Sequence, residues 1–466
     1  MEGQASDIRQ QEVGNAKADQ FGCLFSAAKG LLGRLCKALP DPRGHLRLVR
    51  VGIGLLAGGG GPLTHAIGCR GQDWSADYRL FSKTEWRPDD LFRPIIQECA
   101  RTSSQLFFAA QDDFIVHKTS RKIASYARDP LGPKFRMNLV LAQRFTATSM
   151  LIKPEGGTGQ SRSIPVACDY TPPVPKAGKQ ASKTEVKAVH ELRKKQSVSL
   201  TAGNRIAKLR AELDATPGGG ELTLVVLTDG GFANRNYLAS VPERTITVQR
   251  FRRDAKLREL LPESRRTGNA KYGAKLETPE QYLKNERVPF RKAWVNVGKH
   301  QLRIRFKVRR DIAWQSGTGD RPVTVVSLAP TPYRLRKNGK AIYRNPAYLL
   351  ITGKIKSDTE LIRLIEAYFA RFEIEVNFRD LKQGLALGKA QVWNMKSIRR
   401  VPAFTVACYS CLLLASIKCC GDLRNPQGFH LLPRWRKKGE VRRPSINDLM
   451  TRFKTEAHAW EIMQAA

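Results

Sequence analysis

One short apolar run constrains the fold more than any other feature of the chain. Residues Leu222 to Leu227 read LTLVVL, and Thr228, Asp229 and two glycines follow. A continuous apolar run of this length is typical of a parallel strand that is covered on both faces. Ligands bind at the carboxyl ends of such strands in α/β sheets, so Asp229 is a candidate site residue. A turn-forming aspartate is the simpler alternative.

The segments before this strand predict a mixed α/β sheet flanked by helices. Three strand-like runs follow residue 105, LFFAAQDDFIV, FRMNLVLAQRFTATSMLI and SIPVACDYTPP, with turn signals between them. They indicate an antiparallel meander. A basic stretch at 183–213 is expected to be helical. The first run contains Asp112 and Asp113, and two buried neighbouring carboxylates are costly unless a cation neutralises them.

Changes of pattern along the chain predict five parts. The β-rich pieces from residue 244 onward are separated by a basic stretch at 252–287 that resembles a loop, which indicates an insertion into the core. The expected parts are a helical, basic N-terminal domain at 1–100, the first part of the core at 101–243, a β-rich insertion at 244–352, the second part of the core at 353–418, and a basic tail at 419–466. The basic residues of the N-terminal domain make it a candidate for DNA binding.

The charge of the chain indicates a polyanionic partner. Lys and Arg number 80 against 42 Asp and Glu, which gives a formal net charge of +38. An excess of this size destabilises a compact fold by self-repulsion unless a polyanion neutralises it. Nucleic acid is therefore favoured over a basic surface that serves solubility alone.

The cysteines predict neither export nor a metal site. There are nine, an odd number, and no signal-type segment opens the chain, so a disulfide framework is not expected. Cys408 and Cys411 lie in an apolar run and indicate core packing, because no second pair with zinc-ligand spacing accompanies them. The apolar runs at 51–68 and 402–417 are too short, or too rich in Gly and Pro, to cross a bilayer.

A helix is predicted over 357–384, from an N-cap at Ser357 or Asp358 to Gly384. At about 100° per residue, one narrow stripe of this helix carries Tyr368, Arg371, Glu375 and Lys382. The far side carries Glu366, Glu373 and Asp380. A solvated charged face is the simple interpretation. With Asp112 and Asp229, however, Glu375 completes a set of three carboxylates, the donors that Mg²⁺ selects for phosphodiester chemistry.

The spacing of these residues resembles the signature of a known family. Tyr368, Arg371, Glu375 and Lys382, separated by two, three and six residues, are similar to the YREK signature of bacterial insertion-sequence transposases with an RNase H-like DDE core. The segments LFFAAQDDFIVHKTSRKI and LVVLTDGGF resemble the two aspartate strands of that family. Asp229 and Glu375 are 146 residues apart, similar to members with a β-rich insertion. The resemblance covers about 105–400, and PRWRKKGEVRRPSINDL is similar to the family's tail.

The resemblance implies an RNase H-like mixed sheet flanked by helices, with a β-rich insertion and a helical N-terminal domain. It implies a transposase that binds inverted-repeat ends, cleaves the DNA and transfers the 3′ ends to target DNA by two-metal phosphoryl transfer. Asp112, Asp229 and Glu375 would be catalytic and would hold Mg²⁺, with Mn²⁺ as a substitute. Tyr368, Arg371 and Lys382 would contact the DNA. The implied partners are double-stranded DNA and a second copy of the chain, in a cytoplasmic, nucleoid-associated homodimer without a membrane.

Three points stay open in the sequence. Phe114 stands where the family usually has Thr, which leaves Asp112 or Asp113 as the ligand; the family's D-x-T pattern favours Asp112. Asp169 also follows a strand, but it leads into a proline-rich segment and is not expected to be catalytic. Two alternative functions are an RNase H-like repair or junction nuclease without strand transfer and an inactive domesticated DNA-binding derivative.

Overall fold

The structure is a computed structural model that describes most of the chain. The described residues are 23–37, 39–58, 75–103, 105–128, 138–154, 159–174, 176–267, 271–298, 300–334, 339–424, 428–431 and 442–465. Residues 1–22 and most of the tail-like motif, 433–441, lie outside them. The DNA-binding role predicted for residues 1–100 stays a prediction.

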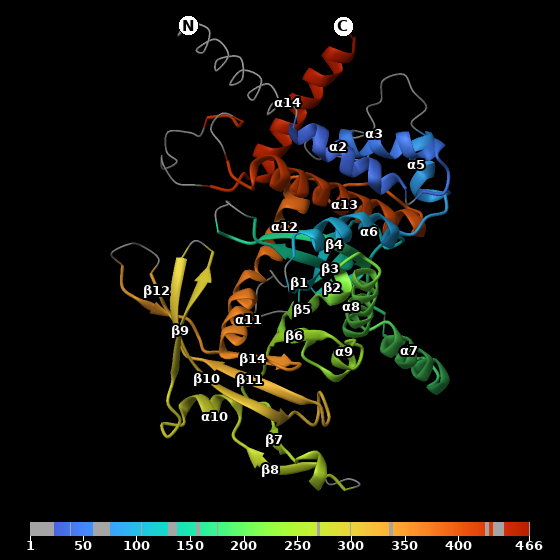
Figure 1. The fold of residues 1–466 in the computed structure, drawn as a ribbon. Helices are drawn as coiled ribbons and strands as arrows, with labels where there is room; N and C mark the ends of the chain where they lie inside the picture. The colour runs from blue at the N-terminus through green and yellow to red at the C-terminus, as the bar shows by residue number, and fades with distance from the viewer. Residues whose placement is uncertain are drawn as a thin grey trace, which may run out of the picture.

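A large mixed sheet runs through the centre of the protein, as predicted for the α/β class (Figure 1). Its first half is an antiparallel meander that continues into two parallel strands. In spatial order the strands are β4 (Arg162–Tyr170), β3 (Leu139–Ile152), β1 (Leu106–His117), β5 (Thr223–Thr228) and β6 (Thr245–Arg250), with β2 (Ser125–Arg128) also paired to β3. The predicted parallel strand at 222–227 is β5, and five of the six residues of β5 have no exposed surface.

The β-rich segment extends this same sheet. Beyond β6 the order is β14 (Ala347–Thr352), β11 (Pro322–Leu328), β10 (His300–Ala313), β7 (Leu257–Leu260) and β8 (Tyr272–Leu276), and β9 (Arg291–Val297) pairs with β10. A small hairpin of β12 (Pro332–Tyr333) and β13 (Ile342–Tyr343) stands apart. The structure differs from prediction twice here. β6 lies within 244–352 yet is the parallel partner of β5, and 252–287 is no loop, because it contains β7, β8 and α10 (Pro279–Lys284).

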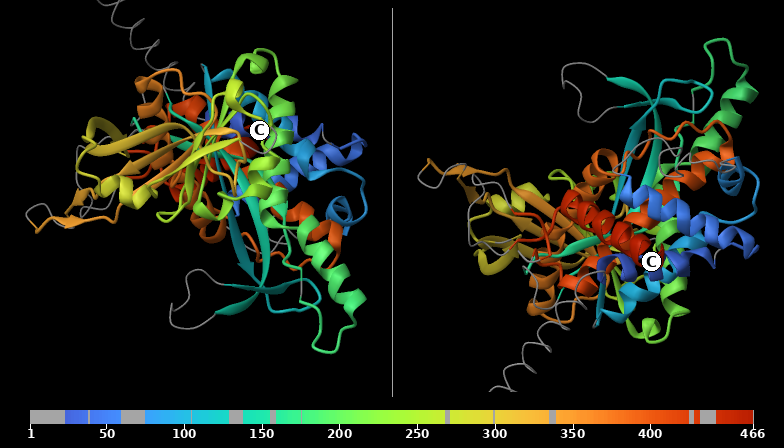
Figure 2. Two further views of the ribbon diagram at one scale, coloured as in Figure 1. Left: turned by 90° about the horizontal axis from the view of Figure 1, so that it is seen from below. Right: turned by 90° about the horizontal axis from the view of Figure 1, so that it is seen from above.

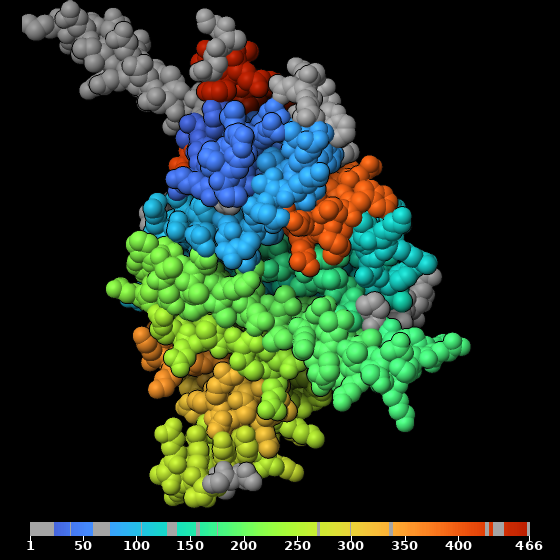
Figure 3. Space-filling model, turned by 90° about the vertical axis from the view of Figure 1, so that its right-hand side faces the viewer, coloured from blue at the N-terminus to red at the C-terminus, as the bar shows by residue number. Residues whose placement is uncertain are grey.

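Helices cover both faces of the first half of the sheet. On one face lie α8 (Val198–Asp214) and the short α9 (Arg235–Ala239), and on the other lie α11 (Asp358–Ala370) and α12 (Glu373–Gln383). The predicted helical stretch at 183–213 is two helices, since α7 (Lys183–Lys195) ends before Ser197, whose hydroxyl caps α8. α7 buries no residue and projects from the body (Figure 3).

The described part of residues 1–100 is helical and packs on the last helices of the chain. α2 (Cys23–Cys36), α3 (Arg43–Ala57), α5 (Ser75–Ser82) and α6 (Pro88–Arg101) share one apolar core with α13 (Met395–Cys420) and α14 (Ile446–Ala465). Figure 2 shows α14 beside the N-terminal helices above the sheet. α13 has the length and apolarity that a membrane span needs, but 78% of its apolar window is buried in the protein. It is therefore a core helix, longer than the run at 402–417.

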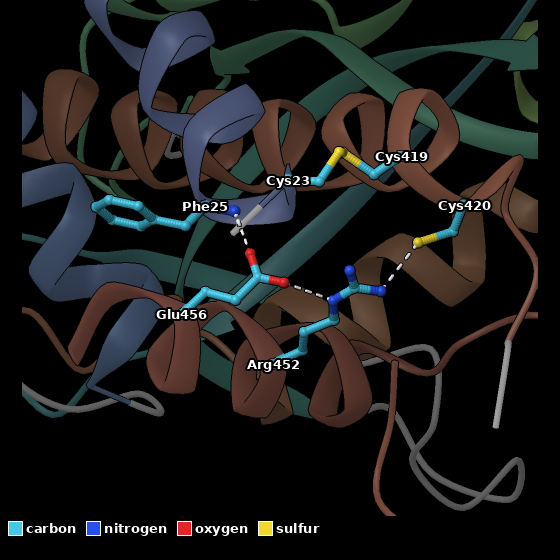
Figure 4. Close-up of a disulfide and its surroundings, with 6 residues drawn as sticks. All are labelled: Cys23, Phe25, Cys419, Cys420, Arg452 and Glu456. Carbon is cyan, nitrogen blue, oxygen red and sulfur yellow. Dashed lines mark hydrogen bonds and ion pairs between the residues drawn. A yellow bond between two sulfur atoms is a disulfide. The ribbon is translucent and has the colours of Figure 1, made fainter. Parts of the chain in front are cut away.

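A disulfide that the odd cysteine count did not predict joins the start of α2 to the end of α13. Cys23 in α2 is bonded to Cys419 at the end of α13, with Cα atoms 5.9 Å apart (Figure 4). Beside it, the Glu456 carboxylate of α14 accepts a hydrogen bond from the Phe25 backbone at 2.7 Å. Cys408 and Cys411 are completely buried, as predicted for core packing, and burial raises the pKa of both thiols.

Candidate active site

The register of β1 and β5 places Asp112 and Asp229 next to each other. Gln111 of β1 is aligned with Thr228, the last residue of β5; Asp112 follows within β1, and Asp229 follows directly after β5. Side chains alternate between the two faces of a strand. Because the Gln111 carboxamide donates to the Ala202 carbonyl of α8 at 3.0 Å, Asp112 lies on the opposite face, where α11 and α12 pack.

The same alternation separates Asp112 from Asp113. Asp112 shares its face with Phe114, whose ring centroid is 4.6 Å from that of Phe378 in α12. Asp113 lies on the other face, where burial raises its pKa and the charge of Arg144 opposes the rise. Phe114, in the position of the family's Thr, thus packs under the helix that carries Glu375. Of the two aspartates, Asp112 is the one that faces this helix.

The predicted single helix at 357–384 is wrong in one respect, because it is two helices. Ser357 caps α11 as expected, accepting from the Glu360 backbone at 3.1 Å, and Gly384 ends α12. Between them, Arg371 and Phe372 form a tightened turn, with i to i+3 bonds from the Ile374 and Glu375 amides at 3.0 Å each. Tyr368 therefore belongs to α11, whereas Glu375 and Lys382 belong to α12.

Arg371 is the centre of the site's ion pairs. Its Nη1 donates to Asp112 Oδ2 at 3.0 Å, and its Nη2 lies 4.0 Å from Glu375 Oε1. Only 6% of its side chain is exposed, against 55% for Glu375. A buried guanidinium requires such partners. The residue that the resemblance assigns to DNA thus connects two of the three predicted carboxylates.

Tyr368 and Lys382 lie around this group. Tyr368 is 6% exposed, and burial raises the pKa of its phenol, with Asp229 raising it further and Arg371 opposing the rise. Tyr368 is therefore within electrostatic reach of both Asp229 and Arg371. Lys382 is exposed on α12, and its Nζ lies 5.7 Å from the centroid of the Phe114 ring. Lys382 is thus on the same side of β1 as Asp112.

Burial and neighbouring carboxylates make ionised Asp112 unfavourable. Burial raises the pKa of Asp112 to about 6; Arg371 lowers it, and Asp113 and Asp229 raise it. A cation at this point would relieve the repulsion. Carboxylate oxygens are the donors that Mg²⁺ selects, so the residues fit this metal by donor type. In the described part of the chain, however, no three Asp, Glu, His or Cys side chains are gathered closely enough to form a complete metal site.

Sequence reasoning missed a row of buried polar residues directly behind the aspartates. It crosses four adjacent strands and comprises Thr148, Gln111, Thr228 and Gln249. Gln249 Nε2 donates to Thr228 Oγ1 at 3.0 Å and to the Phe232 carbonyl at 3.2 Å, which anchors the chain on both sides of Asp229. Gln111 accepts from the Tyr237 hydroxyl at 3.0 Å. The available signal was a glutamine inside each of two strand-like runs, LFFAAQDDFIV and RTITVQRF.

The acid that was not expected to be catalytic has a structural partner. Asp169, at the end of β4, forms a two-bonded ion pair with Arg205, one bond being 2.7 Å long. Arg205 also binds Asp89 of α6 at 2.6 Å. This pair joins β4, α6 and α8 and does not include Asp112 or Asp229.

Comparison of the chain with models of known protein families and with curated proteins gives no match. The residues and their geometry are therefore the basis on which a function can be inferred.

Proposed function

We propose that the protein is a DDE-type DNA transposase, a polynucleotidyl transferase and endonuclease with an RNase H-like core. It would bind the inverted-repeat ends of its element, cleave the DNA and join the 3′ ends to target DNA. One observation carries the proposal. Asp112 in β1 and Asp229 directly after β5 follow the aligned residues Gln111 and Thr228, Asp112 lies on the face that α12 covers, and Arg371 lies between Asp112 and Glu375.

The sheet order supports the RNase H-like part of the proposal. β1 lies between an antiparallel meander, β3 and β4, and two parallel strands, β5 and β6. Predicted acids stand on the central strand β1, after β5 and on the later helix α12. This is the arrangement that the YREK resemblance implies.

Bound Mg²⁺ would activate the attacking oxygen and stabilise the leaving oxygen of a phosphodiester. Asp112 and Asp229 would contribute carboxylate oxygens from two neighbouring strands, and Glu375 would contribute another from α12. Arg371 balances the charge of Asp112, and its planar guanidinium suits a phosphate. Lys382 would add a point charge from α12. The Tyr368 hydroxyl would donate a hydrogen bond to the DNA beside Arg371.

The charge of the chain supports DNA as the partner. A net charge of +38 favours a polyanionic partner, because the excess positive charge repels itself in the compact fold. The homodimer, the Mg²⁺ requirement and the cytoplasmic, nucleoid-associated location stay predictions from the resemblance.

The test is cleavage of a plasmid that carries the DNA flanking the coding region, in Mg²⁺ and in Mn²⁺. Asp112→Asn, Asp229→Asn and Glu375→Gln should abolish cleavage while DNA binding by anisotropy stays within about twofold, because phosphate contacts remain. Asp113→Asn is the matched control, since it alters the adjacent acid on the opposite face. Normal cleavage by Asp229→Asn refutes the proposed site. So does the opposite pattern at the neighbouring acids, in which Asp113→Asn loses cleavage and Asp112→Asn retains it.

Strand transfer separates the transposase from the alternative nuclease. A pre-cleaved end with a free 3′-hydroxyl should become joined to a target plasmid. Hydrolysis products alone would indicate the repair or junction nuclease, which shares the same acids.

A further inference from the structure

The strands β9 and β10 form a two-stranded ribbon with an unusual outer face. Their register aligns Trp294 with Arg303 and Lys292 with Arg305. These four side chains are exposed on one face, and Trp294 is 61% exposed. On the other face Val295 and Ile304 are buried in an apolar cluster that includes Leu361 of α11. We call the set of Lys292, Trp294, Arg303 and Arg305 the ribbon face.

The cations of the ribbon face have no carboxylate partner within the described residues. Neighbouring cations do have one, since Arg291 lies 3.0 Å from Asp358 and Arg309 lies 2.9 Å from Glu277. Basic residues on an outer strand also discourage aggregation, which is the simple explanation for Lys292, Arg303 and Arg305. It does not explain an exposed tryptophan among them. A large aromatic ring beside cations that no carboxylate neutralises is typical of surfaces that bind nucleic acid.

Two contacts with α11 direct the ribbon toward the candidate active site. Arg291 at the start of β9 pairs with Asp358 at the start of α11. Near the end of β9, the backbone and side-chain amides of Asn296 each donate to Glu366 at 3.0 Å. Glu366 is two residues before Tyr368. β9 therefore runs along α11 in the same direction, and Figure 1 shows the ribbon rising beside α11 toward α12.

We propose that the ribbon face binds the backbone of double-stranded DNA beside the candidate active site. Lys292, Arg303 and Arg305 would contact phosphates, and the Trp294 ring would pack on the adjoining sugars. The inference rests on the proposed function in taking DNA as the partner, and it adds the surface that holds the duplex next to the acids. Arg303 and Arg305 are two residues apart on one strand, or about 7 Å, so they would reach different phosphates.

The test measures binding of a fluorescent duplex by anisotropy over a salt series. Arg303→Ala/Arg305→Ala should weaken binding about tenfold and reduce the slope of log K against log salt by about 1.8, which is 0.9 for each phosphate that the variant no longer neutralises. The matched control is Lys256→Ala/Lys275→Ala, which removes the same charge from exposed positions beside and within β7 and β8 at the far end of the sheet. Charges beyond about 8 Å are largely screened at physiological salt, so the control should stay within twofold.

Trp294 provides an independent arm. Trp294→Ala should weaken binding about fivefold with an unchanged salt slope, and Trp294→Phe should recover most of the loss, because the ring makes a stacking or packing contact and carries no charge. All these positions are exposed, so melting temperatures should agree within a few degrees. Three results would each overturn the proposal. The two double variants could lose the same amount of affinity, or Arg303→Ala/Arg305→Ala could leave the salt slope unchanged. The protein could also bind single strands more tightly than duplex.

The binding readout keeps this inference separate from the proposed function. If the wild type cleaves DNA and the ribbon variants bind duplex normally, the ribbon proposal fails alone. If binding depends on the ribbon face but neither cleavage nor strand transfer occurs, the ribbon proposal is supported and the transposase proposal fails.

Discussion

Replacing Arg371 by Met tests the central ion pair of the candidate site. The change removes the guanidinium that donates to Asp112 at 3.0 Å and keeps an unbranched side chain along the buried stem of Arg371. Both partners are largely buried, with 6% of the Arg371 side chain and 18% of the Asp112 side chain exposed. Loss of one partner from such a pair usually costs about 3–5 kcal/mol, because the other charge stays desolvated.

The pKa of Asp112 limits that cost here. Burial raises this pKa from 3.8 to about 6, so ionised Asp112 already destabilises the metal-free fold by about 3 kcal/mol. At pH 7 the penalty cannot exceed about 4 kcal/mol, because Asp112 takes up a proton instead. Losing Arg371 therefore adds only about 1 kcal/mol of charge penalty at pH 7. It adds about 3 kcal/mol at pH 8 and almost nothing at pH 5, where Asp112 is mostly protonated already.

The sign of the effect follows from the raised pKa. An acid whose pKa is higher in the folded state loses stability as pH rises from its unfolded value to its folded value, and Arg371→Met extends that loss to higher pH. Urea unfolding in EDTA at pH 5, 7 and 8 measures it. The difference in stability between wild type and variant should grow with pH. In the background of Asp112→Asn it should become independent of pH, since the titrating group is gone. A difference that is the same at pH 5 and pH 8 in the single variant would contradict the pairing.

Three further predictions follow from other contacts. Mg²⁺ at about 100 times its dissociation constant should stabilise the wild type by about 2.7 kcal/mol in thermal melts, and Asp112→Asn should remove most of this gain; equal stabilisation of both would exclude Asp112 as a ligand. Gln249→Leu loses both hydrogen bonds that anchor the chain around Asp229, so single-turnover cleavage should fall about tenfold or more while duplex binding is unchanged. Cys23→Ser should lower stability by about 2–5 kcal/mol, and a reducing agent should bring the wild type to the same melting temperature; no effect of either would contradict the disulfide.

Local patterns were sufficient for most of the fold. The apolar run at 222–227, the strands of the meander and the caps at Ser357 and Gly384 are signals carried by neighbouring residues, and each appears in the structure. The break at Arg371 has no such signal. It accompanies burial of this side chain against Asp112, a residue 259 positions away in the sequence. The disulfide between Cys23 and Cys419 spans 396 positions, so counting cysteines could not reveal it.

Local sequence patterns also could not predict that the β-rich insertion joins the sheet of the core. Individual strands at 244–352 could be predicted from their residues. That they extend the core sheet depends on the pairing of β6 with β14, as in Thr247 with Thr352. Similarly, the choice between Asp112 and Asp113 needed the knowledge of which face of β1 carries α12. Strand alternation decides it only after that face is known.

The contacts of the charged residues on α11 and α12 test the interpretation that these helices present a solvated charged face. That interpretation is wrong for Tyr368 and Arg371, because both residues are buried. The acids of the far side each have a fold-stabilising partner: Glu366 accepts from Asn296, Glu373 pairs with Arg443 at 2.8 Å, and Asp380 accepts from the Tyr409 hydroxyl at 3.1 Å. Glu375 differs from them. Its side chain is 55% exposed and its ion-pair contact is Arg371 at 4.0 Å, a distance at which an exposed pair contributes little stability. The fold therefore gains little from Glu375, whereas a metal site between β1 and β5 would lack a third carboxylate without it.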